Sequence, residues 1–209
     1  MRVIAATYEI LTPISNGGVN ELKLIEQVGR TCYKSEDKIG DKTAEEFIAR
    51  LIKRGHEAMI EHSMLSVKFI VDRGVSHELV RHRIASFAQE STRYCNYSKE
   101  KFGNELTFIK PCFFDDIKYQ RWLCAMTDAQ CAYFDLLNNG ASPQEARSVL
   151  PNSLKTEVVM TANYREWRNF FKLRTAKAAH PQMREVTIPL LRELQSKLPV
   201  VFDDIVPEV

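Results

Sequence analysis

One stretch of the chain, from Arg81 to Tyr94, concentrates hydrogen-bonding side chains in a way that few folds can accommodate. It begins with the triplet Arg81-His82-Arg83, reaches Ser91 after seven intervening residues, and continues to Arg93. Burying so many polar and cationic groups costs free energy unless an anionic, polar ligand lies at their centre. The stretch therefore predicts a binding site for a ligand that carries phosphate.

Helical geometry divides this stretch between two directions. A helix predicted from His77 to Ile84, with Ser76 as its N-cap, turns by ~100° per residue, so the triplet spreads over ~200°. The three side chains would then reach two ligands, or a ligand and a neighbouring subunit. With Glu78 one turn before Arg81, the spacing also fits a surface ion-pair ladder, and that alternative stays open.

Ser91 is not predicted to be a nucleophile. A nucleophilic serine needs an oriented base beside it, and the G-x-S-x-G pattern that builds such a site is absent from the sequence. Contact with a polar ligand, or a role in a turn, is the better interpretation of Ser91.

A second polar cluster runs from Asn163 to Arg174. On a helix, Arg165 and Asn169 share one face, whereas Arg174 points about 140° away from Asn169. Ligand binding and a solvated helix face both fit this spacing.

Composition narrows the class of protein. The 209 residues carry a net charge of +2, which argues against a nucleic-acid coating protein, and no apolar run approaches the ~20 residues of a membrane span. The five cysteines include no CxxC pair, which favours a reducing cytoplasm. His56 and His62 lack the spacing of a metal motif, so no metal site is predicted.

The apolar periodicity predicts a single α+β domain over residues 1–209, with a small, mostly antiparallel sheet flanked by several helices. Thr43 is the expected N-cap of one helix, and Gly55 is placed to end it. Residues 158–160 fit a strand or a helix. Strands are expected over residues 2–11 and 64–71, and a further strand is expected to end at residue 109. The expected helices cover 19–33, 43–54, 115–138, 164–175 and 182–197, and a short helix is expected to start after Ser142.

The order of these motifs resembles the flavin-dependent thymidylate synthases. The resemblance rests on the Arg-His-Arg triplet with Ser91, and on further segments that follow the family's order over about residues 50–200. It implies a homotetramer that converts dUMP to dTMP with FAD, NADPH and 5,10-methylenetetrahydrofolate, without nucleic acid or membrane partners. The further matching segments are Gly55-His56-Glu57, Glu61-His62, Arg147-x-x-Leu150-Pro151, Asn163-x-Arg165, Asn169, Leu173-Arg174 and Ala179-His180-x-Gln182.

The resemblance also implies roles for single residues. Arg174 is the expected catalytic residue, because a permanent positive charge stabilises the uracil anion that makes C5 nucleophilic. The expected dUMP contacts are Glu78, Arg81, Gln89, Glu90, Ser91, Thr92, Arg93, Arg147 and Arg174. The expected FAD contacts are His56, Ala58, Arg81, His82, Arg83, Gln89, Asn163, Tyr164, Arg165 and Asn169.

Three positions depart from the family's pattern: Glu78 replaces a common Gln, Ala58 replaces a hydroxyl found in some members, and Gln89 stands where some members have Glu. A related pyrimidine substrate or another reductant is therefore an alternative. A nucleotide- or RNA-binding module without turnover is a second alternative. A thymidylate synthase with a cysteine nucleophile is a third, and Cys112 is its only Pro-Cys candidate.

Overall fold

The computed structural model describes residues 1–14 and 16–208. The chain divides into two compact units, each assembled from three separate segments. The single domain predicted over residues 1–209 stays a prediction, and the units are described separately. Unit 1 comprises Met1–Tyr8, Lys68–Arg81 and Phe87–Val159, and unit 2 comprises Glu9–Val67, His82–Ser86 and Met160–Val209.

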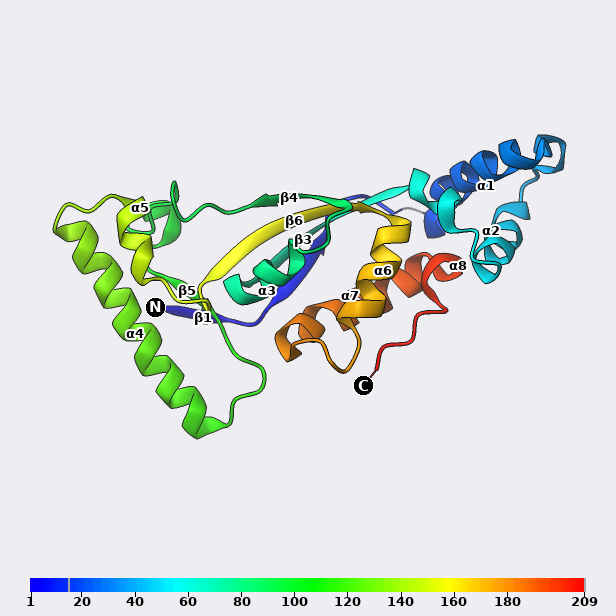
Figure 1. Ribbon diagram of the computed structural model, residues 1–209. Coiled ribbons are helices and arrows are strands. Elements are labelled where there is room, and N and C mark those ends of the chain that lie inside the picture. Colours follow the sequence, from blue (N-terminus) through cyan, green and yellow to red (C-terminus); the bar gives the residue numbers. More distant parts are fainter. Residues whose placement is uncertain (15, 209) are drawn as a thin grey trace. The chain divides into compact units, whose positions relative to one another are not determined.

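The strands form a four-stranded sheet in the order β2-β3-β6-β4 and a separate parallel pair, β1-β5 (Figure 1). The predicted α+β class with a small, mostly antiparallel sheet is confirmed. Each of the four sheet strands contains residues of both units. The strands are β1 (Arg2–Ile4), β2 (Thr7–Ile10), β3 (Met64–Asp72), β4 (Ala85–Gln89), β5 (Thr107–Ile109) and β6 (Lys155–Asn163).

The strand predicted over residues 2–11 is wrong in one respect, because it is two strands. The break at Ala5 and Ala6 separates β1, which pairs with β5, from β2, which pairs with β3. The strand β3 is confirmed, and its alternate residues Leu65, Val67 and Phe69 are buried as predicted. Residues 158–160, which fitted two structures, belong to the long strand β6.

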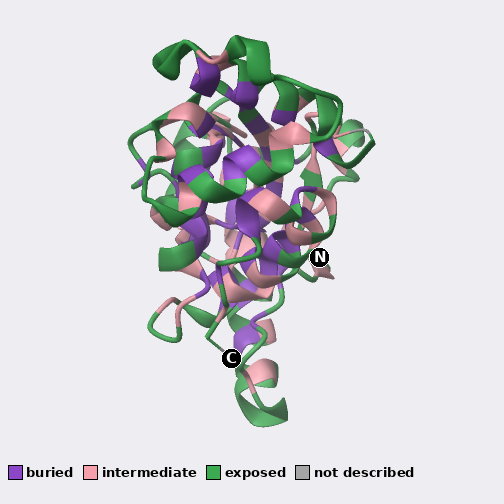
Figure 2. Ribbon diagram, turned by 90° about the vertical axis from the view of Figure 1, so that its right-hand side faces the viewer, coloured by how far each residue is buried: buried purple, intermediate pink, exposed green. Residues whose placement is uncertain are grey.

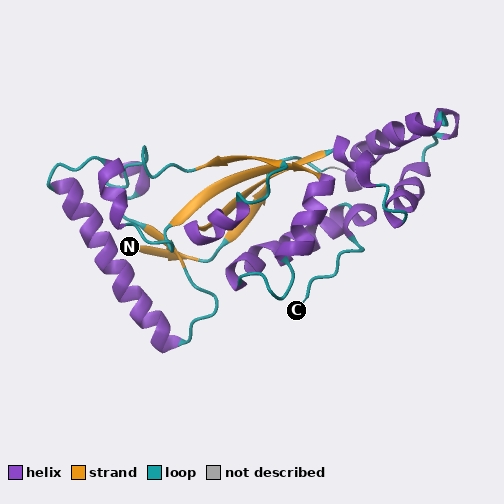
Figure 3. Ribbon diagram, viewed as in Figure 1, coloured by secondary structure: helices purple, strands orange, loops and turns teal. Residues whose placement is uncertain are grey.

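Most helix predictions are confirmed (Figure 3). Among the described helices, none combines the length and the apolar character that crossing a membrane requires. The α-helices are α1 (Val19–Tyr33), α2 (Thr43–Lys53), α3 (Arg73–Leu79), α4 (Asp116–Asn138), α5 (Pro143–Ala146), α6 (Tyr164–Arg174), α7 (Pro181–Lys197) and α8 (Pro199–Phe202). The 3₁₀ segments are η1 (Asn16–Gly18), η2 (Glu36–Lys38), η3 (Glu57–His62), η4 (Glu100–Phe102) and η5 (Arg147–Val149).

The helix predicted from His77 to Ile84 is wrong in its position. Helix α3 begins earlier, because the Asp72 carboxylate accepts a hydrogen bond from the Val75 amide at 2.7 Å and thereby caps it. The helix ends at Leu79, before the Arg-His-Arg triplet. The triplet is therefore not helical, and the expected 200° fan does not describe it.

Thr43 is the first residue of α2 and not its N-cap, which is Lys42. The Thr43 hydroxyl donates to Glu26 at 2.9 Å and accepts from the Gly40 amide at 2.9 Å, so it joins α2 to α1. Gly55 follows α2 with a φ of 72°, a left-handed conformation that favours glycine and ends the helix as predicted.

Each unit has its own apolar core, and in Figure 2 the helices carry buried residues along one side and exposed residues along the other. In unit 1, Trp122 and Tyr133 of α4 belong to one buried cluster with Phe108. In unit 2, Trp167 and Phe171 of α6 stack with ring centroids 5.7 Å apart. This packing fixes which face of α6 remains exposed.

Candidate functional site

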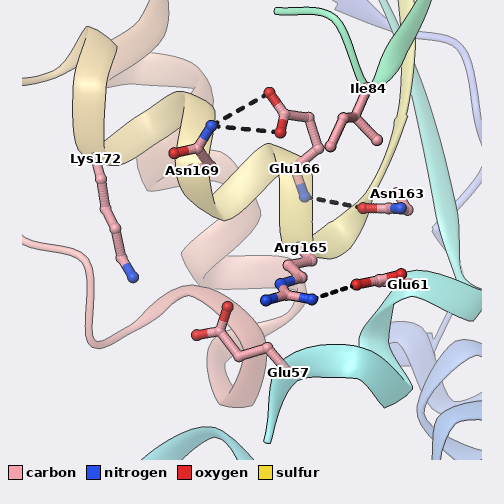
Figure 4. A pocket seen from close by; sticks show the side chains of 8 residues that line it. All are labelled: Glu57, Glu61, Ile84, Asn163, Arg165, Glu166, Asn169 and Lys172. Carbon is pink, nitrogen blue, oxygen red and sulfur yellow. Dashed lines mark hydrogen bonds and ion pairs between the residues drawn. The ribbon is translucent and has the colours of Figure 1, made fainter. Parts of the chain in front are cut away.

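Unit 2 contains a pocket of about 480 Å³ on the exposed face of α6 (Figure 4). Its volume falls within the ~300–1,000 Å³ typical of small-molecule sites. The walls come from η3, from the loop that carries Ile84, from the end of β6 and from α6. The lining residues are Glu57, Glu61, Ile84, Asn163, Arg165, Glu166, Asn169 and Lys172.

The end of β6 and the start of α6 are joined by a side-chain cap. The Asn163 side-chain oxygen accepts a hydrogen bond from the Glu166 amide at 2.9 Å, so the strand turns directly into the helix. Arg165, Asn169 and Lys172 then recur at intervals of four and three residues and line the same pocket. The sequence prediction that Arg165 and Asn169 share one face is therefore confirmed.

The carboxylates of the pocket each have a partner within unit 2. Glu61 accepts a hydrogen bond from Arg165 Nη1 at 2.5 Å, and both side chains are partly exposed. Glu57 forms an ion pair with Arg168 Nη2 at 3.1 Å. Each pair lowers the repulsion that its carboxylate would exert on an anionic ligand.

Arg168 is a buried cation with only 1% of its surface exposed. It pairs with Glu57 of η3 and with Asp204 Oδ1 at 2.6 Å, and it also donates to the Val201 carbonyl. Its hydrogen bond to Asp204 is the main reason that the pKa of that carboxyl lies below its ordinary value. Arg168 thus joins the C-terminal segment to the wall of the pocket.

A chain of three side chains leads from the pocket to the end of α6. His82 is buried, and its Nδ1 lies 2.9 Å from Glu166 Oε1. Arg174 Nε donates to His82 Nε2 at 3.0 Å. Burial lowers the pKa of His82 below its ordinary value of 6.5, although the hydrogen bond to Glu166 acts in the opposite direction. His82 is therefore neutral at neutral pH.

In unit 1, the predicted nucleotide residues lie in α3 and the turn after it, at the end of β4 and in the segment that follows, and in η5. Arg81 is exposed, and its amide donates to the Glu78 carbonyl at 3.2 Å. Ser91 Oγ accepts from the Arg93 amide at 3.3 Å, which fits the predicted turn role. Arg93 Nε donates to Gln144 at 3.2 Å, which ties this segment to α5.

Glu90 is engaged inside unit 1. Its carboxylate accepts hydrogen bonds from Tyr97 Oη at 2.8 Å and from Lys155 Nζ at 3.0 Å, and its amide donates to the Glu157 carbonyl at 2.9 Å. Burial raises the pKa of Tyr97, so the phenol remains protonated and donates. The Glu90 side chain therefore anchors its segment.

Gln89 is anchored in a similar way. Its Nε2 donates to Ser76 Oγ at 2.9 Å and to Thr156 Oγ1 at 3.2 Å. Thr92 is buried, whereas Arg147 in η5 is exposed. Nine residues were predicted to contact the nucleotide, and eight of them lie in unit 1: Glu78, Arg81, Gln89, Glu90, Ser91, Thr92, Arg93 and Arg147.

The predicted flavin residues lie in unit 2, except for Arg81 and Gln89. Asn163, Arg165 and Asn169 line the pocket. The side chain of Tyr164 is fully buried, so this residue presents only its backbone to a ligand. The lining of the pocket does not include the other predicted flavin residues of unit 2, which are His56, Ala58, His82, Arg83 and Tyr164.

The sequence analysis assigned no site role to Glu57, Glu61, Glu166, Arg168 and Lys172. Lys172 continues the helical spacing of Arg165 and Asn169, so this spacing could have predicted its place in the pocket. The contact of Glu166 could not be predicted from local spacing, because its partner His82 lies 84 residues away in the sequence. Among the described residues, no group of three or more His, Cys, Asp or Glu is arranged to hold a metal ion.

Comparison with known proteins gives a consistent result. Residues 18–200 match the family described as "Thymidylate synthase complementing protein". A flavin-dependent thymidylate synthase of Corynebacterium aurimucosum is 32% identical over 91% of this chain and 82% of its own length. An enzyme of the same name from Mycobacterium avium is 34% identical over 87% of this chain and 78% of its own length. Another, from Pyrococcus furiosus, is 33% identical over 88% of this chain and 74% of its own length. The chain therefore belongs to the flavin-dependent thymidylate synthase family.

Proposed function

We propose that this chain catalyses the reductive methylation of dUMP to dTMP, with 5,10-methylenetetrahydrofolate as carbon donor and NADPH as reductant through bound FAD. Membership of the family supports the reaction class. The observation that carries the proposal within the structure is the pocket on α6, with Arg174 held by His82 in the same unit.

The donor set of the pocket fits a flavin nucleotide. The side-chain amides of Asn163 and Asn169 offer both donors and acceptors, which suits the polar edge of a flavin ring. Lys172 offers a cation for a diphosphate, whereas Arg165 is already paired with Glu61. Bound flavin would supply the reducing equivalents for the reaction.

The proposed dUMP residues of unit 1 combine exposed arginines with an anchored backbone. Arg81, Arg93 and Arg147 are exposed and suit the phosphate, because a guanidinium forms paired hydrogen bonds with its oxygens. Gln89 and Glu90 hold the segment before Ser91 through their own contacts. We assign these two residues to holding that segment in place for the nucleotide.

The proposed role of Arg174 follows from charge. Removing the N3 proton of uracil creates an anion that makes C5 nucleophilic, and a guanidinium remains charged under these conditions. Arg174 is half-buried, so its charge acts in surroundings where water screens it less than in bulk.

We also propose that the enzyme is a homotetramer with its active sites between subunits. Large apolar side chains near the proposed ligand residues are exposed in the single chain, including Ile84 at 71%, Tyr94 at 77% and Leu173 at 55%. We propose that these side chains pack against neighbouring subunits, since burial would remove their apolar surface from water.

A single assay tests the proposed function. Purified protein is expected to be yellow and to release tritium from 5-tritiated dUMP when FAD, NADPH and methylenetetrahydrofolate are present. A colourless protein that takes up no FAD would contradict the flavoenzyme. Tight dUMP binding without tritium release would instead favour a nucleotide-binding module.

A further inference from the structure

We propose that Glu166 and His82 are positioning residues that hold Arg174 in its orientation, with Glu166 fixing the tautomer of His82. The inference rests on the role proposed above for Arg174 in activating the uracil. Glu166, His82 and Arg174 all belong to unit 2, although the sequence places His82 far from the other two.

The tautomer follows from the partners of His82. Arg174 Nε can only donate a hydrogen bond, so His82 Nε2 must accept it with a lone pair. The ring proton then lies on Nδ1, which donates to Glu166 Oε1 at 2.9 Å. An ionised carboxylate accepts and does not donate, which excludes the opposite tautomer.

Glu166 is itself held from a second side. Asn169 Nδ2 lies 3.4 Å and 3.3 Å from its two carboxylate oxygens, and the Asn163 side chain accepts from the Glu166 amide. Only 8% of the Glu166 side chain and 4% of the His82 side chain are exposed. A buried and hydrogen-bonded chain of this kind restricts the rotation of its members, because rotation would leave buried polar groups unpaired.

The position of Arg174 shows why such support matters. It is the last residue of α6, where a long side chain has many rotamers to lose on ordering. Contact with His82 removes part of that freedom before a ligand binds. Misplacement of a reacting group by about 1 Å costs on the order of 100-fold in rate.

The arrangement is sensitive to protonation of His82. The charged groups that act on its ring are Glu166 and Arg174, both on α6, where the ring also contacts the edge of Phe170 at a centroid distance of 4.9 Å. A proton on Nε2 would remove the acceptor of the Arg174 Nε–H and place two positive charges together. Burial holds the pKa of His82 below its ordinary value and so opposes this protonation.

Nitrogen NMR of the protein labelled with ¹⁵N-histidine tests the tautomer without any turnover. The chain has only five histidines, and the signal lost in His82→Gln identifies the residue. We expect neutral His82 with its proton on Nδ1 at pH 7. In Glu166→Gln, the pKa of His82 should fall further, because the lost carboxylate raises it. The Nε2–H tautomer in the wild type, or an unchanged pKa and tautomer in Glu166→Gln, would overturn the proposal.

Arginine labelling and kinetics test the positioning. The Nε–H of Arg174 should exchange slowly with water in the wild type and at least tenfold faster in Glu166→Gln. With FAD at saturation, that variant should show a kcat about 10- to 100-fold lower, and Glu166→Asp should recover part of it. Glu46→Gln, which alters an exposed pair on α2, is the matched control.

The two hypotheses fail separately. If the wild type does not turn over dUMP, the proposed function fails, whereas the histidine tautomer and the arginine exchange still decide the positioning chain. If Glu166→Gln matches the wild type in kcat and in Arg174 exchange, the positioning chain is wrong and the proposed function stands.

Discussion

Arg174 is a residue whose removal should affect turnover without affecting flavin binding. It does not line the pocket on α6, so the pocket should keep its flavin when Arg174 is removed. Its charge is the group proposed to stabilise the uracil anion, and losing one such group costs about 100- to 1,000-fold in rate.

We therefore expect Arg174→Ala to retain the flavin absorbance and to lose at least about 100-fold in kcat for dUMP. Tritium release and the visible spectrum measure the two properties on one sample. Arg50→Ala, which removes an exposed arginine from α2, should change neither. Full activity of Arg174→Ala would remove this residue from its proposed role.

Arg168 is the buried cation on which two carboxylates depend. Removing one partner of a buried ionic network leaves uncompensated charge, so Arg168→Met should lower the free energy of unfolding by about 3 kcal/mol. Arg50→Ala disrupts an exposed pair and should cost less than about 1 kcal/mol. Urea unfolding of both variants measures the difference, and equal losses would contradict the prediction.

The difference in the free energy of unfolding between the wild type and Arg168→Met should depend on pH. The pKa of Asp204 is lower in the folded protein than its ordinary value of 3.8, chiefly because Arg168 donates to it. Its stabilising contribution is therefore complete above about that value and disappears as the pH falls through the lower, folded-state pKa. The stability gap between wild type and Arg168→Met should narrow in that acid range.

At the scale of elements, helix α3 depends on a residue that also ends a strand. Asp72 is the last residue of β3 and the N-cap of α3. Asp72→Ala should lower the free energy of unfolding by about 1 kcal/mol, whereas Asp72→Asn keeps a capping oxygen and should cost only a few tenths. Thermal or urea unfolding distinguishes the two variants, and equal losses would mean that capping is not the cause.

The elements that could be predicted from the sequence are those with local signals. Helix α1 has a clear apolar period, and α4 has both an N-cap at Asp115 and an Asn-Gly end. The start of α3 was missed because Asp72 and Ser76 are both good capping residues, and only the end of β3 decides between them. The break between β1 and β2 was missed because it depends on their partner strands, β5 and β3, which lie far away in the sequence and belong to different sheets.

The candidate site shows the same limit. The face shared by Arg165 and Asn169 follows from helical spacing alone. The contact between His82 and Arg174 joins residues that lie 92 positions apart, so no local pattern encodes it. The pairing of Arg168 with Glu57 and Asp204 is hidden for the same reason.

At the scale of the whole molecule, the proposed homotetramer makes a direct prediction. The chain has a mass of 24.1 kDa, and the native protein should sediment at about four times that value. Replacing the exposed Ile84 by Lys should shift the protein toward smaller species, because a charge is costly inside an interface. A wild-type monomer with full dUMP turnover would contradict active sites between subunits.

Unit 2 consists of separate segments of the chain, which the ribosome synthesises at different times. Its pocket needs η3 and Ile84 from the first half of the chain, and Asn163 to Lys172 from near the end. A ribosome adds roughly 5–20 residues per second, so the early segments wait for seconds before their partners emerge. During that interval α1 can already pack against α2 and η3, whereas α8, which also contacts α2, has not yet been synthesised. Newly made chains should thus become able to bind flavin only after Lys172 has been synthesised, and a chaperone would find its substrate in the nascent helices α1 and α2.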